Sequence, residues 1–143
     1  MHIRELGRAD FESPELWRLL WLACETSDAE LSHIRDDVLP QLTVVGIGDD
    51  GLAGFIAFHP VEGGVEIDYI ATEVASQGRG IGRALVGEVV RRYPAEPIIA
   101  ETDDDAIHFY RKLGFVDSPA ARDSRWPERA RYRCLLAPGS AIE

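Results

Sequence analysis

The segment from residue 65 to residue 93 constrains the fold most, because it predicts a strand, a glycine-rich turn and a helix in immediate succession. Residues 65–72 (VEIDYIAT) have the composition of a strand, and the turn SQGRG follows a few residues later. Apolar side chains then recur at helical spacing, before Pro94 stops the helix: Ile81, Ala84, Leu85 and Val89.

The turn is unusual because three glycines and two arginines occupy residues 78–83 of an otherwise acidic chain. Glycines let the backbone approach a ligand closely and let successive N–H groups point into one concavity. At a helix N-terminus such groups form an anion site suited to phosphate or pyrophosphate. Arg79 and Arg83 add positive charge there. The turn therefore predicts a phosphate site; the alternative is a tight strand-to-helix connection that holds no ligand.

The other segments predict short strands and helices in the order β-α-α-β-β-β-α-β-α-β-β. The further expected strands are residues 2–6, 42–47, 52–59, 98–101, 115–116 and 132–136, with GDDG as a hairpin turn. One early helix starts at Pro14 after Ser13, and a second starts near Ser27 or Asp28 and ends before Pro40. This order indicates an α/β (α+β) protein with a mixed sheet and helices on its faces.

The segment TDDDAIHFYRKLGF predicts a compact helix with clear end signals. Aspartates at 103–105 suit its positive N-terminus, basic residues at 111 and 112 suit its negative end, and Gly114 follows as the terminating residue. His108 falls on the polar face, so we expect it to be exposed. The expected buried stripe consists of four residues: Ala106, Phe109, Tyr110 and Leu113.

Charge and composition exclude several classes of protein. A net charge of −10 argues against nucleic acid as a partner, because phosphate backbones are bound by basic surfaces. Cys24 and Cys134 form no C-x-x-C pair, and nothing suggests a metal site. The longest apolar run, residues 51–58, is far shorter than the roughly 20 residues of a membrane helix. We therefore expect a soluble, cytoplasmic, single domain over residues 1–143, with no membrane partner.

A dinucleotide-binding fingerprint matches the glycine turn only in part. Gly78 and Gly80 fit the first two glycines of G-x-G-x-x-G, and Glu101 lies at about the right distance to contact a ribose. Arg83, however, stands where the third glycine belongs. A nicotinamide dinucleotide enzyme is therefore the weaker reading of this turn.

Two motifs resemble those of the GNAT N-acetyltransferases. Residues 77–82 (QGRGIG) fit the Q/R-x-x-G-x-G/A signature with which that family binds the pyrophosphate of acetyl-coenzyme A. Residues 106–115 (AIHFYRKLGF) resemble its second motif, A-x-x-F/L-Y-x-x-x-G-F. The resemblance is close over residues 41–117 and implies a mostly antiparallel sheet of about six or seven strands. Two of those strands would splay apart at the cofactor site.

The resemblance also implies which residues bind acetyl-CoA. The end of the 65–72 strand would pair with the pantetheine arm through Ile70, Ala71 and Thr72. The pyrophosphate would be held by the signature and its neighbour: Gln77, Gly78, Arg79, Gly80, Ile81, Gly82 and Arg83. Tyr110 would lie near the coenzyme sulfur and protonate the departing thiolate; it could equally be a core aromatic. Asp103 stands where the family often has a coenzyme-contacting Asn, or it serves only as a helix cap.

Two carboxylates are candidates for the base that deprotonates the amine. Glu66 and Asp68 alternate with apolar residues, so both face the same side of one strand. Glu66 falls where the histone-acetylating branch of the family carries its glutamate base, and Asp68 would act as base or as substrate anchor. The alternative for both is a solvated sheet face or an ion pair. His59, at a strand end, could also reach the site.

The resemblance thus implies an enzyme that moves the acetyl group of acetyl-CoA to a primary amine by direct attack in a ternary complex. The acceptor would be an amine-bearing small molecule or a peptide, and a homodimer is left open. A non-catalytic acyl-CoA sensor is the alternative. Aromatic and acidic groups near the expected acceptor site would suit an amine: Trp17, Trp21, Glu25 and Trp126. Core packing explains Trp17 and Trp21 equally well.

Overall fold

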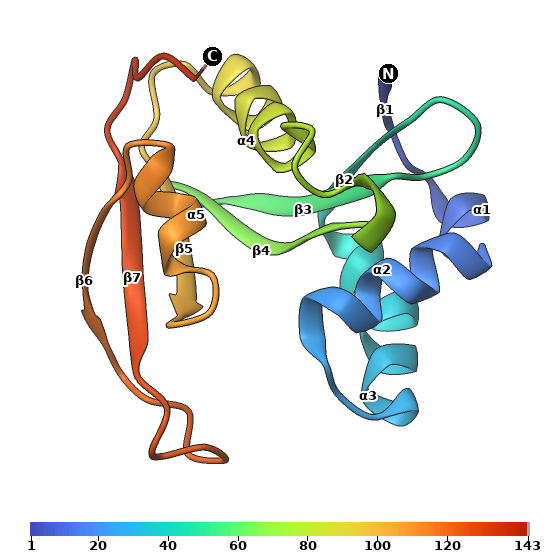
Figure 1. Ribbon diagram of the computed structural model, residues 1–143, viewed down its shortest axis with the longest axis horizontal. Helices are drawn as coiled ribbons and strands as arrows, with labels where there is room; N and C mark the ends of the chain where they lie inside the picture. Colours follow the sequence, from blue (N-terminus) through green and yellow to red (C-terminus); the bar gives the residue numbers. More distant parts are fainter. Residues whose placement is uncertain (143) are drawn as a thin grey trace.

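A seven-stranded mixed sheet forms the centre of the part of the chain that the computed structural model describes, residues 1–142 (Figure 1). The strands lie in the order β1-β2-β3-β4-β5-β7-β6, and every neighbouring pair is antiparallel except β4 and β5. Their bounds are β1 His2–Glu5, β2 Thr43–Gly48, β3 Gly54–Val61, β4 Gly64–Thr72, β5 Ile98–Asp103, β6 Val116–Ala120 and β7 Arg131–Leu136. The expected fold class is confirmed.

Helices cover both faces of this sheet, and each face has its own apolar core. The helices α1 (Arg8–Phe11), α2 (Pro14–Cys24) and α3 (Asp28–His33) pack on one face. On the other face lie α4 (Ile81–Arg92) and α5 (Ile107–Lys112). None of the helices within residues 1–142 is long and apolar enough to cross a membrane.

Capping residues place the helix ends largely where the sequence predicts them. The Ser13 hydroxyl accepts a hydrogen bond from the backbone N–H of Leu16 at 3.1 Å, and Pro14 occupies the first turn of α2. Gly114 follows α5 with φ +98°, the left-handed conformation that a terminating glycine adopts at least cost.

Two helical segments differ from the expectation. The second early helix does not stop before Pro40: α3 continues into a π-helical turn (Ile34–Val38) and a 3₁₀ turn (Leu39–Gln41). Pro40 fits in the first turn of the latter, where its missing N–H is no loss. The helix α5 begins only at Ile107, because β5 extends through Asp103. Ile107 therefore takes the buried place expected of Ala106, which is partly exposed.

The strands β4 and β5 diverge, as the family resemblance implies. Their parallel pairing joins only residues 65–67 to residues 98–100, although β4 continues to Thr72 and β5 to Asp103. In β4, Asp68 is an extra residue, because Ala57 of β3 pairs with Tyr69 while Phe58 pairs with Ile67. Such a bulge bends its strand and increases its local twist.

Candidate active site

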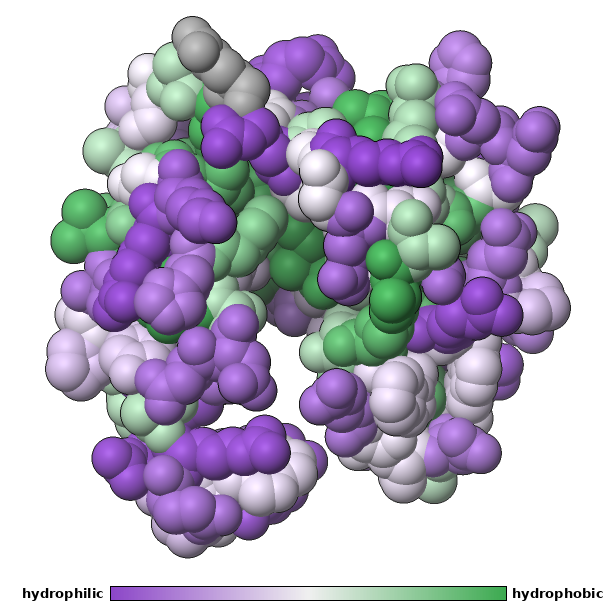
Figure 2. Space-filling view, viewed as in Figure 1, coloured by the Kyte–Doolittle hydropathy of each residue, from purple (hydrophilic) through white to green (hydrophobic). Residues whose placement is uncertain are grey.

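A cleft of about 1320 Å³ opens where β4 and β5 part. The glycine turn and the start of α4 line one end of it, and α5 lines one side. Its other end is lined by the α2–α3 connection and by the loop between β6 and β7. Figure 2 shows the molecule hollowed between this loop and the α2–α3 region. One continuous cavity thus joins elements from the middle and both ends of the chain.

Glycine is required at the three positions of the turn for two different structural reasons. Gly78 and Gly80 have φ angles of +83° and +77°, which side-chain-bearing residues rarely adopt. A Cβ at either position would meet no atom of residues 1–142 within 4 Å. Gly82 has no such φ, but its Cβ would lie 2.7 Å from Cε1 of Phe109 on α5. Two glycines therefore shape the turn beside open space, and the third allows α4 and α5 to approach closely.

This turn fits a phosphate group. Gly80 is the N-cap of α4, and no side-chain hydrogen bond caps this helix within residues 1–142. Uncapped N–H groups at a helix N-terminus attract anions. The cleft is lined by six of the seven residues expected to hold pyrophosphate, while Arg79 is exposed outside it: Gln77, Gly78, Gly80, Ile81, Gly82 and Arg83.

The end of β4 offers backbone groups to the cleft. Ile70, Ala71 and Thr72 line it, and they lie beyond the last residue of β4 that pairs with β5. On their other edge they remain paired with β3. The edge that faces the gap can therefore bind an extended, amide-containing ligand such as a pantetheine arm.

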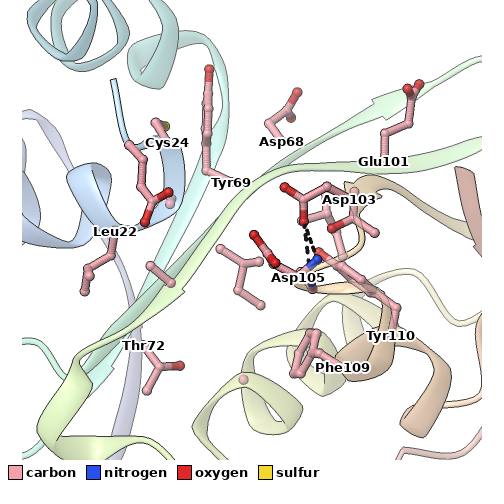
Figure 3. A pocket seen from close by; sticks show the side chains of 18 of the residues that line it. Leu22, Cys24, Asp68, Tyr69, Thr72, Glu101, Asp103, Asp105, Phe109 and Tyr110 are labelled. Carbon is pink, nitrogen blue, oxygen red and sulfur yellow. Dashed lines mark hydrogen bonds between the residues drawn. The ribbon is translucent and has the colours of Figure 1, made fainter. Parts of the chain in front are cut away.

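Tyr110 and Asp103 lie on the opposite side of the gap from Thr72 (Figure 3). The Tyr110 ring packs edge-on against Phe109 and Phe115, and its side chain is almost fully buried. Burial, with a smaller contribution from Cys134, holds the pKa of the Tyr110 phenol well above its usual range. The Asp103 carboxylate accepts hydrogen bonds from the N–H groups of Asp105 and Ala106, so it caps the turn that precedes α5.

The two candidate bases share a histidine partner. Nδ1 of His59 lies 2.6 Å from Oδ2 of Asp68, and its Nε2 lies 3.9 Å from Oε2 of Glu66. The prediction that both carboxylates face one side of the strand is thus confirmed. Asp68 lines the cleft, whereas Glu66 and His59 do not. The same three side chains offer ligand atoms within 4.8 Å of one another, a spacing that could also suit a divalent cation.

Burial raises the pKa of Asp68, and the hydrogen bond from His59 opposes this effect. The neighbouring phenol responds in the same direction: burial, followed by Cys24, Asp68 and Glu30, raises the pKa of Tyr69 to about 12. Burial is thus the main cause of both shifts, and Cys24, Glu30, Asp68 and Tyr69 all line the cleft.

Of the aromatic and acidic residues expected near an acceptor, Glu25 and Trp126 line the cleft, and Trp17 and Trp21 do not. Trp17 is a half-buried residue of α2 that packs against the apolar core, and Trp21 is 48% exposed. His108 is exposed, as predicted. Sequence reasoning missed five residues that line the cleft near the α2–α3 connection and the β6–β7 loop: Cys24, Glu30, Arg125, Arg129 and Arg131. The density of arginines after residue 121 was the only available signal, and it does not say which surface they face.

Comparison with known proteins identifies the class. The family model described as "Acetyltransferase (GNAT) family" matches residues 3–115, so the chain belongs to that family. As a member, the protein is an acetyltransferase that uses acetyl-CoA as its co-substrate. No curated protein matches the sequence.

Solved structures share the fold at low identity. An aminoglycoside 6'-N-acetyltransferase in complex with coenzyme A superimposes with a TM-score of 0.74 at 21% identity, covering 95% of this chain and 96% of the other. A Bacillus subtilis acetyltransferase in complex with CoA gives 0.73 at 24%, covering 95% and 97%. The ribosomal-protein-S18-alanine N-acetyltransferase of Escherichia coli gives 0.70 at 17%, covering 99% and 96%.

Proposed function

We propose that this protein transfers the acetyl group of acetyl-CoA to a primary amine of a small molecule or peptide, by direct attack in a ternary complex. One observation carries the proposal: a single cleft joins the glycine turn and the free edge of β4 to Asp68 and Tyr110. Donor and acceptor can therefore lie side by side, which converts a bimolecular reaction into one between held groups.

Direct attack is supported because the cysteine thiol in the cleft, that of Cys24, stays protonated and is a weak nucleophile. Among the described residues that line the cleft, Cys24 is the one cysteine. Burial, with a smaller effect of Glu30, raises the pKa of its thiol to about 11. Because the thiolate and not the thiol is the nucleophile, Cys24 is a poor carrier for an acetyl group.

The donor would lie along β4 and end at the glycine turn. We assign the pantetheine contacts to the free edge at Ile70, Ala71 and Thr72. The pyrophosphate is assigned to the start of α4 and to residues 77–83, with Arg79 contributing charge from outside the cleft. Asp103 already bonds two backbone N–H groups, so its role is to shape the turn before α5.

The chemical step needs a proton acceptor on the amine and a proton donor at sulfur. We assign the acceptor to Asp68, because it lines the cleft and its raised pKa brings it closer to a base that works near neutral pH. His59 orients Asp68, and Glu66 acts through His59. As the N–C bond forms and the C–S bond breaks, the amine proton passes to Asp68. Tyr110, which its raised pKa keeps protonated, gives a proton to the departing sulfur.

The first test is thermal unfolding with acetyl-CoA, CoA and NAD in parallel, together with thiol release over a panel of amines. Acetyl-CoA at about 100 times its Kd should add roughly 2.7 kcal/mol, a rise on the order of 5–10 °C. Stabilisation by NAD in place of acetyl-CoA would favour the hypothesis of a nicotinamide dinucleotide enzyme. Stabilisation by acetyl-CoA without thiol release from any amine would favour the sensor.

Variants separate the candidate bases. Asp68→Asn should lower kcat/KM by about 10²–10⁴-fold, the usual contribution of a general base, while the acetyl-CoA shift is retained. Glu66→Gln should have a smaller effect if Glu66 acts only through His59; an equal or larger loss would make Glu66 the base. Glu62→Gln is the matched control, since Glu62 is exposed in the turn before β4.

A further inference from the structure

The end of the cleft between the α2–α3 connection and the β6–β7 loop, to which we assign the acceptor, has two walls of opposite charge. The wall formed by the α2–α3 segment and β4 carries acidic groups at Glu25, Glu30 and Asp68. The opposite wall, the β6–β7 loop and the start of β7, carries Arg125, Arg129 and Arg131. In a chain of net charge −10, three arginines on one wall of a cleft are a marked local excess.

The acidic wall keeps its charge available. Within residues 1–142, neither Glu25 nor Glu30 has a basic group within 4.0 Å of its carboxylate. Glu25 ends α2 with φ +45°, a left-handed conformation that turns the chain sharply at the rim of the cleft. Such a wall attracts an ammonium group toward Asp68.

The basic wall is ordered by Trp126 and is only partly neutralised. The guanidinium carbons of Arg125 and Arg129 both lie over the Trp126 ring, at 4.6 and 5.7 Å from its centroid. Arg125 is paired with Asp123 at 2.8 Å. In the described part of the chain, Arg129 and Arg131 have no carboxylate within 4.0 Å. Two guanidinium groups at this wall are therefore available to an anion.

These arginines lie away from the predicted phosphate site of the coenzyme. In Figure 1 the β6–β7 loop is at the lower edge of the molecule, whereas α4 and the glycine turn are at the upper side. The loop instead lies close enough to the acidic wall for their charges to interact. The pKa of Arg125 is raised mainly by Asp123 of the same loop and, to a smaller extent, by Glu30 of α3 on the acidic wall. Because residues of both walls line the same cleft, one ligand bound there can interact with both.

We propose, on the basis of the proposed function, that the acceptor is an amine that also carries an anionic group, a carboxylate or a phosphate. Its amine is drawn to Glu30 and Asp68, and its anion is bound by Arg129 and Arg131. A polyamine suits the acidic wall alone, because its second ammonium group would lie against the arginines. A neutral-tailed amine would leave both guanidinium groups without an ionic partner.

The test is thiol release from acetyl-CoA with matched acceptors. The carboxylate arm uses glycine, β-alanine, 4-aminobutanoate and 6-aminohexanoate, each against its own amide; the phosphate arm compares phosphoethanolamine with ethanolamine. Spermidine represents the polyamines. We expect at least one anionic acceptor to exceed its neutral partner by about tenfold or more in kcat/KM, because a charge-assisted pair is lost in the partner. The arm with the larger ratio of kcat/KM identifies the anion as a carboxylate or a phosphate. The preferred chain length within the carboxylate arm indicates the distance between the acidic and the basic wall.

Variants tie this preference to the basic wall. Arg129→Gln and Arg131→Gln should each reduce the ratio between anionic and neutral acceptors through KM, with the acetyl-CoA thermal shift retained. Arg133→Gln is the matched control. Arg133 is exposed on β7, the strand that also carries Arg131, and its Nη1 lies 4.0 Å from Oε2 of Glu101. It does not line the cleft. This variant should keep the wild-type ratio.

The outcomes separate this inference from the proposed function. Turnover of the neutral partners that equals or exceeds that of the anionic acceptors in both arms, or a preference for spermidine over all of them, would overturn the anionic acceptor and leave the acetyltransferase intact. A ratio that survives in both Arg129→Gln and Arg131→Gln would overturn the assignment to these residues. Absence of thiol release with every amine, together with stabilisation by acetyl-CoA, would overturn the proposed function and this inference with it.

Discussion

Replacing Gly82 by alanine tests the close approach of the first turn of α4 to Phe109 of α5, where both residues line the cleft. The new Cβ would lie 2.7 Å from Cε1 and 3.0 Å from Cζ of Phe109, against an ordinary carbon–carbon contact of about 3.5–4.0 Å. The Phe109 ring packs edge-on against Tyr110 with the centroids 5.0 Å apart, so a shift of the ring away from residue 82 would disturb this contact. Overpacking of this kind costs about 1–3 kcal/mol.

A second glycine of the same helix provides the control. Among the described residues, a Cβ at Gly87 would meet only Cγ2 of Ile142, at 3.9 Å, which is an ordinary contact. Gly87→Ala should therefore stabilise the protein by about 0.5–1 kcal/mol through helix propensity alone. Gly82→Ala gains part of the same propensity but loses more to the clash, so we expect a net loss of about 1–2 kcal/mol.

Urea unfolding of the two variants measures the difference directly. We expect Gly82→Ala to be less stable than Gly87→Ala by about 2 kcal/mol, with unchanged m-values. Adding Phe109→Leu to Gly82→Ala should recover about 1 kcal/mol relative to the sum of the single changes, because the two sites are in contact. Equal stability of the two alanine variants would refute the reasoning, since the clash would then have no energetic consequence.

Three further predictions concern ionisable groups. Hydrogen bonds from Arg91 and then Arg92 lower the pKa of Glu88 to about 2. The stabilisation from Glu88 is therefore complete above the ordinary glutamate pKa and is lost as the pH falls toward 2. Glu88→Gln should cost about 1 kcal/mol at pH 7, and urea titrations should show its difference from wild type shrinking between pH 5 and 2. Tyr110→Phe keeps the packed ring and should lower kcat by about 10²-fold with little change in acetyl-CoA affinity; an unchanged kcat in stopped-flow thiol release would remove Tyr110 from acid catalysis. Because the pKa of Asp68 is raised, kcat/KM should fall on the acid side at a pH above the ordinary aspartate range. A pH profile of Asp68→Asn that retains this acid limb would assign the limb to another group.

Local signals in the sequence were sufficient to predict most elements and the position of the glycine turn. The Ser13–Pro14 start of α2 and the Gly114 end of α5 depend on hydrogen bonds and φ angles within a few residues. The apolar stripe of α4 depends on helical periodicity alone. The start of α5 was misplaced because the aspartates that resemble a helix cap belong to the end of β5 and to the turn after it.

The chain by itself thus determined the order of strands and helices, the acidic surface and the anion-suited turn, because each follows from residues close together in the sequence. Only the tertiary structure decided what those parts form. The cleft exists because β4 and β5, whose pairing joins segments 65–67 and 98–100, separate beyond Ile67. A bulge in β4 places Asp68 opposite no residue of β3, and Asp68 lines the cleft while Glu66 does not. The charged walls meet across the cleft although they are about a hundred residues apart in sequence. No local pattern encodes such contacts, because their geometry depends on how the whole sheet twists and pairs.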